Sequence, residues 1–146
     1  MSRSVDYPVG QIAERLERVS ILRSLSGRQL HKLAKWVKVR EFSEGETIVK
    51  RGEGGLGLFL ILEGAAEVRR GTRKLARLGV GQFFGEMTLF DDQPRSADVM
   101  AIQTSKCAVL SKWEFWGFAT AEPVVLRGIL EEMSRRLRET NQALSE

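Results

Sequence analysis

The chain has 146 residues, of which 42% are hydrophobic and 29% charged, and its net charge is +4. This composition is that of a soluble globular protein, and the length predicts one domain, residues 1–146. The single cysteine, Cys107, excludes an internal disulfide and predicts a reducing, cytoplasmic location. Because the chain has only one histidine as well, it has few side chains for a zinc site or for Cys/His catalysis. No secretory signal is evident, and the longest apolar run, Leu58 to Leu62, is too short to cross a membrane.

Residues 8–36 have a helical pattern. Pro8 suits a first helical turn, and Ser20 to Ser26 reads as a break between two helices. The apolar positions on either side of the break recur at helical spacing: Ile12, Leu16 and Val19, then Leu30, Leu33, Ala34 and Val37.

Residues 37–111 predict short strands joined by glycine-containing turns, one of them the hairpin turn Arg70-Gly71-Thr72. Several short strands at regular spacing favour a jelly-roll-like β-barrel, here with helices on both flanks. The expected strands are Val37–Phe42, Thr47–Lys50, Leu58–Leu62, Ala66–Arg69, Arg73–Leu78, Asp98–Ile102 and Cys107–Leu110.

Residues 112–146 predict a pair of C-terminal helices. Ser111 and Glu114 have capping-box spacing, and Pro123 suits the first turn of a second helix. That helix carries a heptad-like seam that can pack on the barrel, pair with a second copy, or do both. The seam consists of Leu126, Leu130, Met133, Leu137 and Leu144, and the aromatic residues before it, Trp113, Phe115, Trp116 and Phe118, are expected in the core or in a hinge.

The segment 81–97 has the chemistry of a nucleotide pocket. Gly85 allows a ligand to approach the backbone, and the helix expected after it offers free N–H groups to a phosphate. Arg95 adds a planar cation and Ser96 a hydroxyl. Glu86 would repel a phosphate, but it suits a sugar hydroxyl as a hydrogen-bond acceptor.

These residues resemble the phosphate-binding cassette of the cyclic nucleotide-binding domain family, in particular the sensor domains of bacterial cyclic-AMP receptor proteins. The cassette, residues 83–97, matches at Phe84-Gly85-Glu86-Met87, Leu89 and Arg95-Ser96-Ala97, with Thr88 where alanine or serine is commoner. A second signature of the family lies upstream, at Phe42, Gly45-Glu46, Ile48, Gly52-Glu53, Phe59, Glu63-Gly64 and Val68.

The resemblance implies a role for each matched position. Glu86 would bind the ribose 2′-hydroxyl, and Arg95 and Ser96 the cyclic phosphate. Thr140 would bind the purine amino group, and Asn141 would reach the ligand of a second subunit. The implied ligand is cyclic AMP, with cyclic GMP and cyclic dinucleotides left open, and no cofactor or metal. The full set of expected ligand-binding residues is Phe84, Gly85, Glu86, Met87, Arg95, Ser96, Ala97, Thr140 and Asn141.

The resulting hypothesis is that the protein is a sensor and not an enzyme. Its ligand would reposition the helix beginning at Pro123, and this movement would change a homodimer or the surface for a downstream protein. A second hypothesis is the effector half of a DNA-binding transcription regulator. Because the sequence stops at Glu146 without a recognition helix, no DNA binding is expected from this chain alone. A hydrolase, and an interaction module that binds no ligand, are two further hypotheses.

Overall fold

Two antiparallel sheets form the body of the protein. The computed structural model describes residues 3–54 and 57–145, so residues 1–2, 55–56 and 146 of the predicted domain lie outside the described residues. One sheet has the order β1-β2-β9-β4-β7 and the other the order β3-β8-β5-β6, and this confirms the predicted jelly-roll-like fold. The strands are β1 (Arg3–Val5), β2 (Lys38–Phe42), β3 (Thr47–Val49), β4 (Gly57–Glu63), β5 (Ala66–Arg70), β6 (Arg73–Leu78), β7 (Phe83–Phe84), β8 (Asp98–Ala101) and β9 (Ser105–Ser111).

Strand β4 contributes to two separate cores, which explains why it reads as a continuous apolar run. Because successive side chains point to opposite faces of a sheet, Leu58 and Leu60 pack toward the helices, whereas Phe59 and Ile61 pack between the two sheets. The strand therefore fixes the helical layer and the inside of the sandwich relative to each other.

The helices flank the sheets at both ends of the chain. They are α1 (Val9–Leu16), the 3-10 turn η1 (Ser20–Leu22), α2 (Gly27–Ala34), the 3-10 turn η2 (Glu86–Leu89), α3 (Lys112–Ala121) and α4 (Pro123–Ser145). The predicted capping box of Ser111 and Glu114 begins α3, and an equivalent one, Ser26 with Gln29, begins α2. Each supplies partners for N–H groups that a helix start leaves unpaired.

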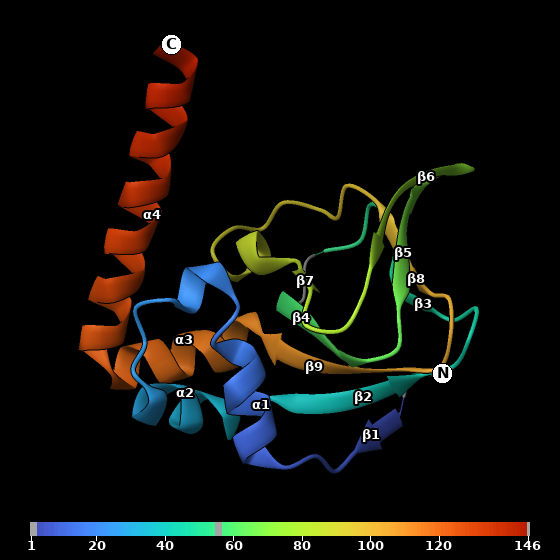
Figure 1. Cartoon of the computed structure of the whole chain (residues 1–146), viewed down its shortest axis with the longest axis horizontal. Coiled ribbons are helices and arrows are strands. Elements are labelled where there is room, and N and C mark those ends of the chain that lie inside the picture. The colour runs from blue at the N-terminus through green and yellow to red at the C-terminus, as the bar shows by residue number, and fades with distance from the viewer. Residues whose placement is uncertain (1–2, 55–56, 146) are drawn as a thin grey trace.

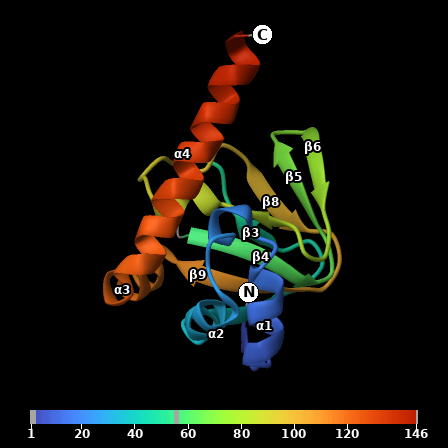
Figure 2. The same ribbon diagram turned by 60° about the vertical axis from the view of Figure 1, so that its left-hand side comes forward.

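Helix α4 starts beside α3 and then extends away from the sheets, and the β5–β6 hairpin projects from the other side of the molecule (Figure 1). Strand β7 and the turn η2 lie between these two projections, and the turned view shows the same separation (Figure 2). Within the described residues, no helix is long and apolar enough to cross a membrane. Cytoplasmic location remains a prediction from Cys107.

Two details of the sequence prediction need correction. The sequence does not predict the strands β1 and β7, because three and two residues are too short to show a strand period. Trp113 is expected in the core or a hinge, and its 82% exposure shows that it is not in the core. It occupies the first turn of α3 and faces outward, whereas Phe115 and Phe118 are buried as predicted.

Candidate functional site

The predicted cassette folds as a strand, a turn and a loop that returns to the barrel. Gly85 separates β7 from η2 with a left-handed φ of 79°, a conformation that glycine adopts without strain. At the other end of the loop, the Arg95 N–H donates to the Glu53 carbonyl (2.9 Å) and the Gly52 N–H donates to the Arg95 carbonyl (2.9 Å). These two bonds tie the backbone of Arg95 to the glycine turn that follows β3.

A cavity of about 410 Å³ lies within this segment, a size within the usual range for small-molecule sites. Seven of the nine predicted ligand-binding residues line it, from Phe84 to Met87 and from Arg95 to Ala97. Val49, Val68 and Val99, all from the β3-β8-β5-β6 sheet, complete its apolar side. The structure therefore brings both halves of the cassette to one place.

Arg95 is a buried cation, with 9% of the residue exposed. Its Nη2 donates to the Gly57 carbonyl (2.9 Å), and its guanidinium carbon lies 5.6 Å from the centre of the Phe59 ring. Burial lowers the pKa of Arg95 from its usual value, because a charge loses solvation away from water. Its Nε has no hydrogen-bond partner among the described residues.

Gly85 leaves the space that Arg95 occupies. A Cβ built at Gly85 would collide with Nη1 of Arg95 and would lie 2.6 Å from the Gly57 carbonyl oxygen. The need for glycine at this position thus has two independent causes, the backbone angle and the guanidinium packed against it.

Glu86 contributes a carboxylate to the same cavity. Its Oε1 accepts a hydrogen bond from Nη1 of Arg136 (3.3 Å), whereas its buried Oε2 has no partner among the residues that the structure describes. One oxygen is thus held in place, and the other has unused hydrogen-bond acceptor capacity.

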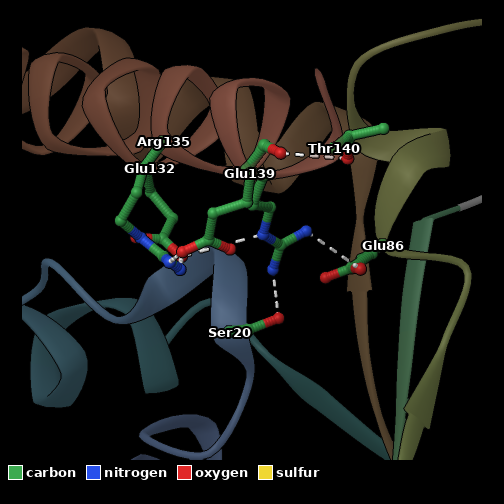
Figure 3. Close-up of polar contacts among 7 residues, drawn as sticks. Ser20, Glu86, Glu132, Arg135, Glu139 and Thr140 are labelled. Carbon is green, nitrogen blue, oxygen red and sulfur yellow. Dashed lines mark hydrogen bonds and ion pairs between the residues drawn. The ribbon is translucent and has the colours of Figure 1, made fainter. Parts of the chain in front are cut away.

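Arg136, on α4, joins three parts of the chain and is not among the predicted site residues. Besides Glu86 it bonds to the Ser20 hydroxyl of η1, and its Nε lies 3.7 Å from Oε1 of Glu132 (Figure 3). Glu132 is itself held by Arg135, and that hydrogen bond is the main reason why the pKa of Glu132 is lowered. The sequence contained one indication of this role: Arg136 lies four residues before the predicted ligand-binding residue Thr140, so the two share one face of a helix.

Thr140 and Asn141 are not among the residues that line the cavity. Both are exposed on α4, and the Thr140 hydroxyl donates to the carbonyl of Arg136 (3.0 Å) (Figure 3). The predicted contact of Thr140 with a purine therefore requires α4 to lie differently or a second copy of the chain to be present, and the contact predicted for Asn141 requires that second copy.

A larger cavity, about 570 Å³, contains none of the predicted ligand-binding residues. Its lining residues include Phe59, Val109, Lys38, Lys112 and Trp113. Lys38 and Lys112 form ion pairs with Glu114 and Asp92. The smaller cavity is the better candidate site because it holds two buried polar atoms, Arg95 Nε and Glu86 Oε2, that have no partner among the described residues.

The pattern of residues 39–122 matches the family described as the cyclic nucleotide-binding domain. The chain belongs to this family. It is 38% identical over 101 residues to the cAMP-dependent protein kinase regulatory subunit of Debaryomyces hansenii, over 68% of this chain and 22% of that protein. It is 33% identical over 141 residues to the subunit of the same name from Dictyostelium discoideum, over 90% of this chain and 41% of that protein. The matches thus span less than half of these curated relatives.

Solved structures of bacterial proteins share the fold. The N-terminal domain of a transcriptional regulator from Streptomyces coelicolor A3(2) is 27% identical with a TM-score of 0.84, over 89% of this chain and 94% of that one. The catabolite activator protein of Thermus thermophilus is also 27% identical, with a TM-score of 0.68, over 86% of this chain and 62% of that one.

Proposed function

We propose that this protein is a sensor that binds a cyclic nucleotide, with cyclic AMP as its ligand, and that residues 1–146 act as one unit. The observation that carries the proposal is the pair of unsatisfied polar atoms, Arg95 Nε and Glu86 Oε2. Buried polar groups without partners are rare and costly, and here one is a donor on a cation and the other an acceptor. A ligand that carries both an anion and a hydroxyl satisfies both.

Each half of the cavity would bind one part of the ligand. Arg95 and Ser96 bind the cyclic phosphate, together with backbone N–H groups near Gly85 and Met87. Glu86 accepts a hydrogen bond from the ribose 2′-hydroxyl. Ser96 after the arginine favours cyclic AMP over cyclic GMP, and the regulatory subunits similar to this chain are named as cAMP-dependent.

The role of the protein would be regulatory rather than catalytic. Arg136 bonds to Oε1 of Glu86 and so connects the carboxylate to α4. A sugar hydroxyl that binds the other oxygen, Oε2, changes the position of this carboxylate and thereby shifts the population of α4 positions. Of the seam residues, Leu130, Leu137 and Leu144 are exposed. A change in α4 would thereby alter a homodimer or a surface for a downstream protein.

Isothermal titration calorimetry with cyclic AMP and cyclic GMP tests the proposal. We expect binding, with cyclic AMP preferred, and we expect Arg95→Ala to weaken it by about 10–150-fold, because charge-assisted hydrogen bonds contribute about 1.5–3 kcal/mol each. Arg127→Ala is the matched control, since Arg127 is an exposed arginine whose partner is Glu131. Wild-type protein that binds neither nucleotide at submillimolar concentration would refute the proposed function.

A second candidate function is the effector half of a DNA-binding regulator. The similarity to the N-terminal domain of a transcriptional regulator, which covers 94% of that domain, favours it. The deciding observation is the reading frame after codon 146: a helix-turn-helix segment there supports the regulator, and a stop codon supports a separate sensor.

A further inference from the structure

The carbonyl oxygen of Gly57 contacts two side chains of the candidate site, those of Arg95 and Thr88. It accepts the hydrogen bond from Arg95 Nη2 (2.9 Å), and the Thr88 hydroxyl oxygen lies 3.0 Å from it. Gly57 has a φ of 132°, and a Cβ there would collide with the Leu110 carbonyl. The tight pairing of β4 with β9 at this point therefore sets the direction of the Gly57 carbonyl.

The Thr88 hydroxyl lies between two carbonyl oxygens. It is within hydrogen-bond distance of Gly57 O (3.0 Å) and of Gly85 O (2.6 Å), and 9% of Thr88 is exposed. A hydroxyl has one proton and can donate to only one of them at a time. Gly85 O also accepts from the backbone N–H of Thr88 (3.1 Å), so it keeps a donor when the hydroxyl turns to Gly57.

From this geometry, we propose that Thr88 is a positioning residue for Arg95: its hydroxyl ties the first turn of the cassette to the carbonyl that holds the guanidinium. The proposal rests on the proposed function for its effect on affinity. The family pattern has alanine or serine at this place more often. An alanine has no hydroxyl and a serine has one, so the link between η2 and Gly57 depends on a hydroxyl at this position.

The physical effect is preorganisation of the cation. Among the described residues, the Arg95 side chain donates one hydrogen bond, to Gly57 O, and a guanidinium held by one bond can rotate about it. The Thr88 hydroxyl holds η2 against that carbonyl, and the neighbouring Gly85 packs directly against the guanidinium, so the rotation is restricted. A ligand phosphate meets an arginine whose orientation is already set, and less ordering entropy is lost on binding.

The test compares Thr88→Val, which keeps the branched shape and removes the hydroxyl, with Thr88→Ser, which keeps the hydroxyl. Titration calorimetry with cyclic AMP should show Thr88→Val weaker by about 2–13-fold, the effect of one hydrogen bond of about 0.5–1.5 kcal/mol. Thr88→Ser should stay within about twofold of wild type, on the same argument.

A second readout needs no ligand. The Nε–Hε resonance of Arg95 in a nitrogen–proton NMR spectrum of the free protein, identified by its loss in Arg95→Ala, should shift in Thr88→Val and stay in place in Thr88→Ser. A role of Thr88 in stability alone would leave this resonance unmoved in a variant that is still folded.

The outcomes separate the two proposals. If Thr88→Val binds like wild type, or binds more weakly with the Arg95 resonance unmoved, the positioning role is wrong. If wild-type protein binds neither cyclic AMP nor cyclic GMP, the proposed function fails. In that case the resonance of Arg95 in the free protein still decides whether Thr88 positions it.

Discussion

Two glycines of this chain share a left-handed backbone but differ in their surroundings. Gly45 has a φ of 83° and open space where a Cβ would stand, whereas Gly85 has a φ of 79° and the Arg95 guanidinium in that place. Alanine at either position should cost about 1–3 kcal/mol of backbone strain. Only Gly85→Ala should also displace Arg95, and so only it should weaken nucleotide binding.

The comparison of the two variants isolates that contact. Thermal unfolding should show a lower Tm for both Gly45→Ala and Gly85→Ala, and calorimetry should show normal affinity for Gly45→Ala alone. Equal affinities in the two variants would mean that the space at Gly85 is not needed by the ligand site.

At the scale of an element, neighbouring residues of helix α4 differ in how far they are exposed to solvent. Ile129 is 0% exposed, whereas Leu130 is 59% exposed. Ile129→Ala should lower the free energy of unfolding by about 2–5 kcal/mol, the usual cost of emptying a core position. Leu130→Ala should change it by less than about 0.5 kcal/mol in the monomer, as for most surface substitutions.

Urea unfolding measures these energies, and sedimentation velocity measures the proposed homodimer. If the exposed seam pairs with a second copy, Leu130→Ala shifts the protein toward monomer while its unfolding free energy stays near wild type. A dimer that is unchanged by Leu130→Ala would remove this residue from the interface.

At the scale of the whole molecule, the buried thiol of Cys107 links stability to alkaline pH. Cys107 lies between the two sheets, and burial raises its pKa from 9.0 to about 12. The unfolded chain therefore loses this proton above about pH 9 while the folded protein keeps it. Ionisation favours the unfolded state, so stability should fall between pH 9 and 12, with a maximum slope of about 1.4 kcal/mol per pH unit in the middle of this range.

Cys107→Ala is the control, because it lacks the thiol and keeps every other alkaline titration. The difference in unfolding free energy between wild type and Cys107→Ala should be nearly constant up to about pH 8.5 and should change by about 1 kcal/mol from pH 9 to 10. A difference that is independent of pH over this range would show that the thiol ionises in the folded protein.

The barrel and the cavity were predictable because local sequence determines them. Alternating apolar residues, turn glycines and the Ser111 capping box each act within a few residues, and the cassette is one continuous segment of 15 positions, residues 83–97. The structure places the predicted residues of that segment around one cavity. Their roles toward a nucleotide remain predictions.

What the sequence did not show depends on contacts between distant segments. Arg136 and Glu86 are 50 residues apart, and Arg95 and Gly57 are 38 apart. Neither pair follows from a period or a motif, because only the packed fold brings them together. The exposure of Trp113 was not predictable for a different reason: an aromatic residue next to a helix start does not reveal which way its side chain faces.

Helix α4 acts as a lever in this geometry. Its 23 residues span about 34 Å at 1.5 Å per residue, and Arg136 lies about 20 Å along it from Pro123. If the helix pivots near Pro123, a displacement at Arg136 is magnified about 1.7-fold at its far end, by the ratio of these lengths. A small movement at Glu86 would thus become a larger displacement at the C-terminal end of α4.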